Sequence, residues 1–102
     1  MSPQLLDGCV LAVLSRGDAY GYILTQQMKA RLDISESALY PVLRRLQRDG
    51  LLSVYDSNYQ GRNRRYYAIT PVGRTQLDNR RRDWAAFRDG VEELMKEEIQ
   101  DG

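Results

Sequence analysis

Apolar side chains recur at helical spacing through the first half of the chain. Each run begins near a residue type that commonly caps a helix, namely Ser2 (followed by Pro3), Asp18 and Ser35. Gly50 follows the third run and is a typical helix stop. The pattern predicts three amphipathic helices, over residues 3–17, 18–32 and 35–49.

The third predicted helix has two distinct faces, when successive residues are placed about 100° apart. One face is apolar and consists of Leu39, Val42, Leu43 and Leu46. The opposite face carries Ser37, Tyr40, Pro41, Arg44 and Arg48. Proline inside a helix removes a backbone hydrogen bond and costs about 3 kcal/mol. Pro41 therefore indicates a constraint from packing or function.

Two short segments rich in aromatic and β-branched residues follow, at 51–55 and 65–69, and predict paired strands. The stretch 56–64 between them is polar, basic and contains glycine, so we expect a hairpin loop with a cationic tip. Tyr66 and Tyr67 alternate along the second strand, so one should face the core and the other outward; the pattern does not say which.

A last helix is predicted from Pro71 to about Ile99. At 1.5 Å per residue it would extend about 43 Å, beyond the body of so small a domain. Its apolar residues follow a coiled-coil seam, interrupted by Gly90, and consist of Leu77, Trp84, Phe87, Val91 and Leu94. Nothing else in the chain is left to cover this seam, so we expect a homodimer.

With 102 residues, of which 42% are hydrophobic and 28% charged, the chain has the size and composition of one globular domain. Its longest apolar run spans only residues 9–14, against roughly twenty residues for a membrane span. We therefore expect a cytoplasmic protein with no membrane partner. The single cysteine, Cys9, has no internal disulfide partner, and its place among apolar residues favours a core position over a reactive thiol.

The chain contains no histidine, which removes the commonest general base and metal ligand. Clustered cysteines for zinc and glycine-rich nucleotide-binding motifs are also missing. We therefore expect no enzymatic activity, no catalytic residue, no metal and no cofactor.

Positive charge is concentrated in the middle of the chain. Residues 1–43 carry a net charge of −1, residues 44–82 of +7 and residues 83–102 of −5. Arginine outnumbers lysine by thirteen to two, and guanidinium groups match phosphates and guanine edges. This distribution favours a nucleic-acid partner.

Three helices, a basic hairpin and a long trailing helix follow one another in the order of a winged helix-turn-helix with a dimerisation helix. The blocks LYPVLRRL (39–46), DGLL (49–52) and GRNRRYYAIT (61–70) resemble, in this order and spacing, the PadR family of bacterial transcriptional regulators. The resemblance covers residues 5–99. The single helix after the wing resembles the shorter PadR subfamily, which includes multidrug-responsive repressors. Asn63 departs from the family pattern, in which proline is common at this place.

The resemblance implies a mainly α fold with a small β-hairpin, in which residues 1–70 form a winged helix-turn-helix DNA-binding domain and residues 71–102 a dimerisation helix. It also implies repression of transcription from a pseudo-palindromic operator of double-stranded DNA, read by helix 35–49 and a basic wing at 57–65. The residues that we expect to contact DNA are Ser37, Tyr40, Pro41, Arg44, Arg48, Arg62, Arg64 and Arg65. Tyr40 has an alternative place, half buried beside Pro41.

The lone tryptophan of the last helix is a candidate effector site. In multidrug-responsive relatives a tryptophan at the matching place stacks on planar ligands, so the resemblance implies a planar aromatic effector bound by Trp84, Phe87 and Cys9. The alternative is that Trp84 only fills the dimer core. The triplet Arg80-Arg81-Arg82 and the acidic residues Glu92, Glu93, Glu97 and Glu98 are expected to face solvent.

An alternative function is a winged-helix module that binds another protein, with the basic helix face pairing with acidic residues of the partner. The dependence of binding on salt separates this alternative from DNA binding.

Overall fold

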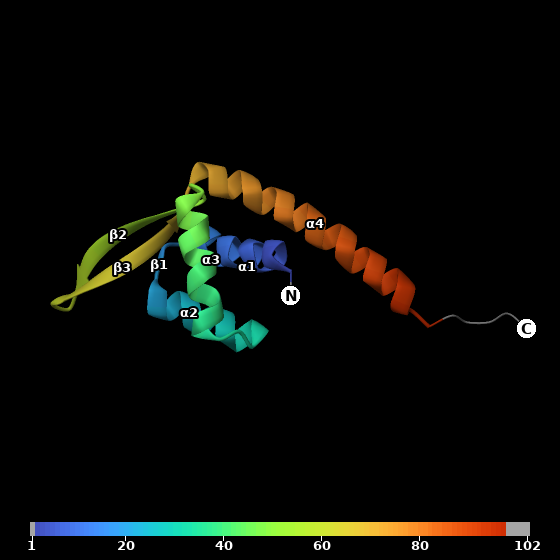
Figure 1. Ribbon diagram of the computed structural model, residues 1–102, viewed down its shortest axis with the longest axis horizontal. Coiled ribbons are helices and arrows are strands. Elements are labelled where there is room, and N and C mark those ends of the chain that lie inside the picture. The colour runs from blue at the N-terminus through green and yellow to red at the C-terminus, as the bar shows by residue number, and fades with distance from the viewer. Residues whose placement is uncertain (1, 98–102) are drawn as a thin grey trace, which may run out of the picture.

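The computed structural model describes residues 2–97. Four helices and a small antiparallel sheet of strand order β1-β3-β2 make up this part of the chain. Figure 1 shows the sheet drawn out into a hairpin at one end of the molecule and the last helix leaving at the other. The elements are α1 (Pro3–Ser15), β1 (Ala19–Tyr20), α2 (Gly21–Leu32), α3 (Glu36–Arg48), β2 (Leu52–Tyr59), β3 (Arg62–Ile69) and α4 (Pro71–Met95).

Three of the four helices begin where the sequence predicts, because a side-chain oxygen caps each of them. The hydroxyl groups of Ser2, Ser35 and Thr70 accept hydrogen bonds from backbone N–H groups three residues further on, at 3.0–3.2 Å. After α3, Gly50 adopts a φ of +78°, a left-handed conformation that suits glycine.

The predicted start of the second helix is wrong. Asp18 is not its cap; the chain first forms the two-residue strand β1, and Tyr20 precedes the helix without a side-chain cap. Ala19 and Tyr20 pair with β3. The Asp18 carboxylate instead accepts a hydrogen bond from the hydroxyl of Tyr55 at 2.6 Å. Pairing with the sheet therefore outweighs the capping preference of aspartate at this position.

The hairpin is longer and its turn tighter than the sequence predicts. The ladder between β2 and β3 continues to the pair Tyr59 and Arg62, so most of the predicted loop 56–64 is strand. Only Gln60 and Gly61 form the turn, with φ angles of +52° and +78°. A two-residue turn with positive φ at both positions matches the right-handed twist of the strands, which lets the ladder extend to the tip.

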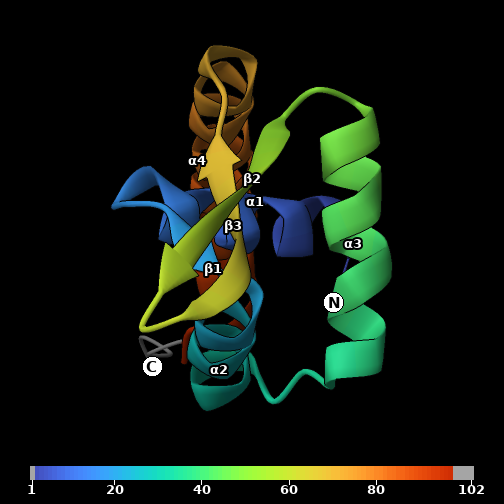
Figure 2. The same ribbon diagram turned by 90° about the vertical axis from the view of Figure 1, so that its left-hand side faces the viewer.

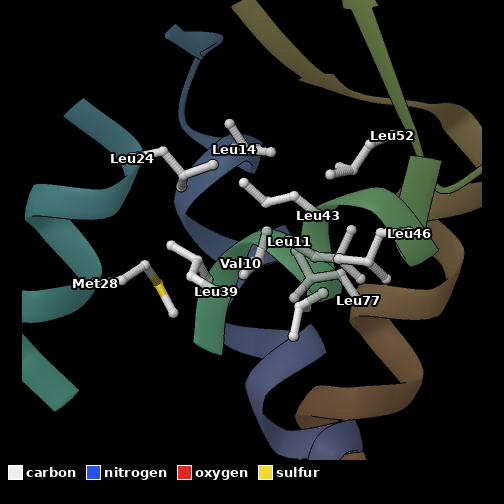
Figure 3. Close-up of a cluster of buried hydrophobic side chains, with 11 residues drawn as sticks. Val10, Leu11, Leu14, Leu24, Met28, Leu39, Leu43, Leu46, Leu52 and Leu77 are labelled. Atoms are coloured by element: carbon white, nitrogen blue, oxygen red, sulfur yellow. The ribbon is translucent and has the colours of Figure 1, made fainter. Parts of the chain in front are cut away.

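The hydrophobic core lies where the three N-terminal helices meet the sheet and the first turns of α4 (Figure 3). The predicted apolar face of α3 is buried throughout, as expected. Tyr67 packs against this core, whereas Tyr66 lies on the other face of the sheet, which settles the choice left open by the alternation. The buried apolar residues are Val10, Leu11, Leu14, Leu24, Met28, Leu39, Val42, Leu43, Leu46, Leu52 and Leu77.

Helix α4 starts inside the body of the molecule and then departs from it (Figure 1). Gly73 is buried at the start, where a Cβ atom would overlap the carbonyl oxygen of Leu51. Leu77 is 3% exposed and belongs to the core of its own chain, which corrects its assignment to the dimerisation seam. The helix ends at Met95, short of the predicted end; Ile99 lies outside the described residues. No helix within residues 2–97 is long and apolar enough to cross a membrane.

Candidate nucleic-acid interface

The polar face of α3 is exposed along its whole length. Ser37, Tyr40, Pro41, Arg44 and Arg48 all lie on the surface, opposite the face that enters the core. Tyr40 is 40% exposed, so its side chain is both partly covered and accessible, and the choice between DNA contact and a half-buried place beside Pro41 stays open. Figure 2 shows α3 standing beside the hairpin, with α4 receding behind the sheet.

An ion pair attaches α3 to α1. The guanidinium of Arg45 donates two hydrogen bonds to the carboxylate of Asp7, at 2.6 and 2.9 Å. The Asp7 side chain is only 7% exposed, and that of Arg45 is 35% exposed. The hydrogen bond to Asp7 raises the pKa of Arg45. This fork-to-fork contact sets the orientation of α3, and hence of its exposed face, relative to the first helix.

The arginines of the wing divide between the two faces of the sheet. We call the face that packs on the core the inner face and the opposite one the outer face. Because side chains alternate along β3, Arg65 lies on the inner face, whereas Arg62 and Arg64 lie on the outer face. Arg65 is 3.8 Å from the Asp56 carboxylate. The inner face lies next to α3. Burial raises the pKa of Tyr67 on this face, and the positive charges of Arg65 on β3 and Arg44 on α3 oppose that rise.

The sequence suggests that Arg64 projects freely from the hairpin tip, but in the structure it does not. Its guanidinium lies over the ring of Tyr20 at 4.4 Å and over that of Tyr59 at 4.9 Å. The side chain is partly buried between the two rings. Arg62, beside the turn, is exposed. Of the three predicted wing arginines, Arg62 and Arg65 are therefore the more accessible.

Sequence reasoning missed a cluster of tyrosines on the outer face. The ring of Tyr66 stacks on Tyr55 at 5.4 Å and meets Tyr20 edge-on at 5.8 Å. Tyr20 also stacks on Tyr22 of α2 at 6.4 Å. The hydrogen bond that Tyr55 donates to Asp18 raises the pKa of Tyr55. The positions of the tyrosines in the two strands could have indicated this cluster, but only if the register of the hairpin, which pairs Tyr55 with Tyr66, had been known.

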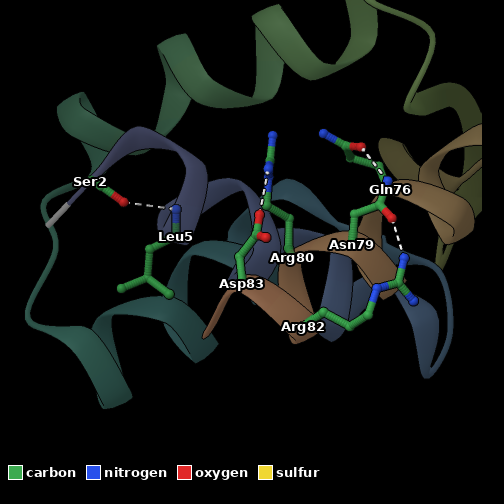
Figure 4. A network of polar contacts seen from close by, with 7 residues as sticks. All are labelled: Ser2, Leu5, Gln76, Asn79, Arg80, Arg82 and Asp83. Atoms are coloured by element: carbon green, nitrogen blue, oxygen red, sulfur yellow. Dashed lines mark hydrogen bonds and ion pairs between the residues drawn. The ribbon is translucent and has the colours of Figure 1, made fainter. Parts of the chain in front are cut away.

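The sequence predicts that all three arginines of the triplet in α4 face solvent, but the structure exposes only two of them. Arg81 and Arg82 are exposed, whereas the side chain of Arg80 is 21% exposed and its Nε atom is buried without a partner. Figure 4 shows Arg80 bonded to Asp83, at 3.1 Å, and Arg82 bonded to Asn79. A Cβ atom on Gly8 would come within 3.0 Å of the Arg80 Cβ, so α1 and α4 cross closely here.

Two cavities meet at Trp84, between α1 and α4. One, of about 360 Å³, is lined by Cys9, Leu32 and Trp84 among others, and the second, of about 480 Å³, by Leu5, Trp84 and Phe87 among others. Trp84 and Phe87 have ring centroids 6.2 Å apart. Burial raises the pKa of the Cys9 thiol. Of the three predicted effector residues, Trp84 lines both cavities, Cys9 only the first and Phe87 only the second; we call the two adjoining cavities the groove at Trp84.

The far half of α4 presents apolar side chains to solvent. Trp84 is 43% exposed, Phe87 63% and Leu94 87%, and Val91 is partly covered. Met95, which the seam pattern leaves out, is 79% exposed. Glu92, Glu93 and Glu97 face solvent as predicted, and Glu98 lies outside the described residues. Within residues 2–97, no cluster of cysteine and acidic side chains is arranged to hold a metal ion.

A helical body, a sheet extended as a hairpin and a basic exposed helix beside it define a winged helix-turn-helix protein. Residues 10–79 match the model of the transcriptional regulator PadR-like family. The chain belongs to this family.

Individual relatives agree with this assignment. A transcriptional regulator of Mycobacterium tuberculosis is 38% identical over 81 residues, which cover 78% of this chain and 69% of the relative. The crystal structure of a Streptococcus mutans protein is similar with a TM-score of 0.88 and 34% identity, over 99% of this chain and 95% of the other. A PadR-like transcriptional regulator from Bacillus cereus gives a TM-score of 0.85 and 31% identity, over 92% and 94% of the two chains.

Proposed function

We propose that this chain is a homodimeric, ligand-responsive transcriptional repressor that binds double-stranded DNA through α3 and the wing. The observation that carries the DNA-binding part is the exposed face of α3, with Ser37, Tyr40, Arg44 and Arg48 along one side of a helix beside a basic hairpin. A helix of this kind fits the major groove, about 12 Å wide. Repression, rather than activation, follows the family resemblance.

In this proposal Arg44 and Tyr40 recognise the operator, whereas the wing arginines mainly attract the DNA backbone. We expect Arg44→Ala to weaken operator binding by about 1–3 kcal/mol. Arg62→Ala, at the exposed wing arginine beside the turn, should weaken all sequences alike and reduce the slope of log affinity against log salt by about one. Arg88→Ala, an exposed arginine on the far half of α4, is the matched control. Unchanged binding of Arg44→Ala to both operator and random duplex would contradict this docking orientation.

The alternative, a winged-helix module for a protein partner, predicts a different salt dependence. If a dimer neutralises six to eight phosphates, log affinity for duplex DNA should fall against log salt with a slope of about −5 to −7. A titration of the wild-type protein on duplex DNA over a salt series measures this slope. A much shallower slope would favour the protein partner.

Dimerisation is assigned to residues 71–102, through the exposed apolar side chains of α4 beyond Leu77. These side chains have no cover within residues 2–97, and a second copy of the helix supplies one. Replacing Val91 and Leu94 together by Asp should give a monomer in sedimentation and abolish operator binding. Arg88→Asp, a charge change on the same stretch, should remain dimeric. A dimer of the double variant at micromolar concentration would refute this assignment.

The effector in this proposal is a planar aromatic compound that stacks on Trp84 in the groove with Cys9 and Phe87. It releases DNA only if it binds the DNA-incompetent arrangement of the dimer more tightly. Because Trp84 is the only tryptophan, its fluorescence reports on the groove directly. Planar cationic drugs, phenolic acids and flavins should quench it saturably and lower operator affinity.

The competing role of Trp84, as filler of the dimer core, is separated by substitution. Trp84→Ala should abolish the response to the compound and leave a dimer that binds DNA, with Trp84→Phe as the control that retains an aromatic ring. A monomer after Trp84→Ala, or no quenching across the panel, would favour core filling.

A further inference from the structure

A further cavity lies away from both the α3 face and the groove at Trp84. It has a volume of about 690 Å³ and lies between the end of α1, one side of α2 and the outer face of the sheet. This volume is within the range of pockets that hold small-molecule ligands, about 300–1,000 Å³. Neither the DNA contact nor the effector groove proposed above uses this cavity.

One wall of the cavity is aromatic and held in place. Tyr20 and Tyr66 line it. Tyr20 contacts the edge of Tyr66, stacks on Tyr22 and carries the Arg64 guanidinium over its ring, and Tyr66 stacks on Tyr55. These neighbours cover much of the two ring faces, so a flat ligand ring meets the parts of Tyr20 and Tyr66 that remain open to the cavity, and the fixed wall loses little conformational entropy when it does.

The charged groups of the cavity favour an anion. Arg16, at the end of α1, and Arg31, near the end of α2, both line it, and within residues 2–97 neither side chain makes an ion pair or a side-chain hydrogen bond. The one carboxylate in the lining, Asp18, already accepts a hydrogen bond from Tyr55. Two free guanidinium groups suit a phosphate monoester, which carries up to two negative charges and several acceptor oxygens.

The remaining polar groups suit a ligand body that carries hydroxyl and amino groups. The amide of Gln27 lines the cavity and both donates and accepts, and the second oxygen of the Asp18 carboxylate can accept. A flat base, a ribose and one phosphate combine the groups that these walls recognise. We propose that the cavity binds a nucleoside monophosphate, with its base against Tyr20 and Tyr66 and its phosphate near Arg16 and Arg31.

The proposal is tested by calorimetric titration of the full chain, without DNA, with AMP, GMP, CMP and UMP. At least one nucleotide should bind saturably with one site per chain. Adenosine, which lacks the phosphate, and inorganic phosphate, which lacks the ring, should each bind at least about tenfold more weakly. No saturable binding at millimolar nucleotide, or equal binding of inorganic phosphate, would overturn the proposal.

Variants locate the site. Arg16→Gln and Arg31→Gln should each weaken nucleotide binding about tenfold or more, since each removes charge-assisted hydrogen bonds. Arg74→Gln, an exposed arginine of α4 outside the cavity, should leave it unchanged. Gln27→Glu should weaken binding by adding a negative charge, while Gln47→Glu on α3 should not. Equal effects of a cavity variant and its control, with far-UV circular dichroism unchanged, would refute the location.

A second assay separates this site from the DNA interface, so that either proposal can fail alone. The cavity is lined by residues of α1, β1, α2 and β3 and by the residues between α1 and β1, and none of the proposed DNA-contacting residues of α3 or the wing lines it. Arg16→Gln should therefore bind duplex DNA as the wild type does, within about twofold. A loss of DNA binding that matches its loss of nucleotide binding would assign Arg16 to the DNA backbone instead and overturn the nucleotide site.

Discussion

Removal of one partner of the Asp7–Arg45 ion pair should destabilise the protein unequally, depending on which partner is lost. Arg45→Ala leaves the carboxylate of Asp7, 7% exposed, without its two hydrogen bonds. Breaking a fully buried pair costs about 3–5 kcal/mol. Since the Arg45 side chain is 35% exposed and water can partly replace it, we expect a loss of about 2–3 kcal/mol.

The opposite substitution should be milder. Asp7→Ala removes the buried charge itself and leaves a guanidinium that can reach water, so we expect a loss of about 1–2 kcal/mol. The double variant should lose less than the sum of the two single variants, because removing the second partner costs little once the pair is broken.

Urea unfolding of the four proteins, at one fixed protein concentration, measures these differences. In thermal unfolding, Arg45→Ala should lower Tm by about 10 °C or more. Arg44→Ala, the exposed neighbour on the same helix, is the control and should stay within about 0.5 kcal/mol of the wild type. Additive losses, or a loss below about 0.5 kcal/mol for Arg45→Ala, would refute the reasoning that this pair holds α3 on α1.

Three further outcomes follow from single positions. Gly73→Ala should destabilise the protein by about 2 kcal/mol or more in urea unfolding, because its Cβ would overlap the carbonyl oxygen of Leu51; wild-type stability would show that α4 shifts without cost. Gln60→Asn should raise stability by about 0.5 kcal/mol, since Asn before Gly61 favours this turn, and a lower midpoint would contradict the turn geometry. Cys9 should react with iodoacetamide more slowly at pH 8 than a free thiol, because its raised pKa leaves less thiolate; an equal or faster rate would contradict its burial.

The sequence predicts the helices well because their apolar positions repeat and their caps are local. Ser35 and Gly50 mark the ends of α3, and the repeat assigns its two faces correctly. The wing is harder to predict, since its turn is Gln60-Gly61 and not one of the dipeptides that usually announce a hairpin. The polar residues before and after the turn resemble a loop but pair as strands.

Contacts between distant segments also escape the sequence. Asp18 carries the signal of a helix cap, yet it bonds to Tyr55, 37 residues away. Leu77 fits the spacing of an exposed seam, but the spacing cannot show that the chain's own core covers it. The pairing of Arg64 with Tyr20 and Tyr59 likewise requires three strands to be aligned first.

Helix α4 is both part of the core and the arm that leaves it, and it is continuous over 25 residues. Its buried end works as the short side of a lever and its exposed end as the long side. At 1.5 Å per residue the helix extends about 33 Å beyond Gly73, so a tilt of about 10° at Gly73 displaces the far end by about 6 Å. Conversely, a displacement of a few ångströms at the far end of α4 rotates the body of the molecule, which carries α3 and the wing. This coupling needs no hinge inside the helix, because α4 is one continuous helix that the core holds at one end.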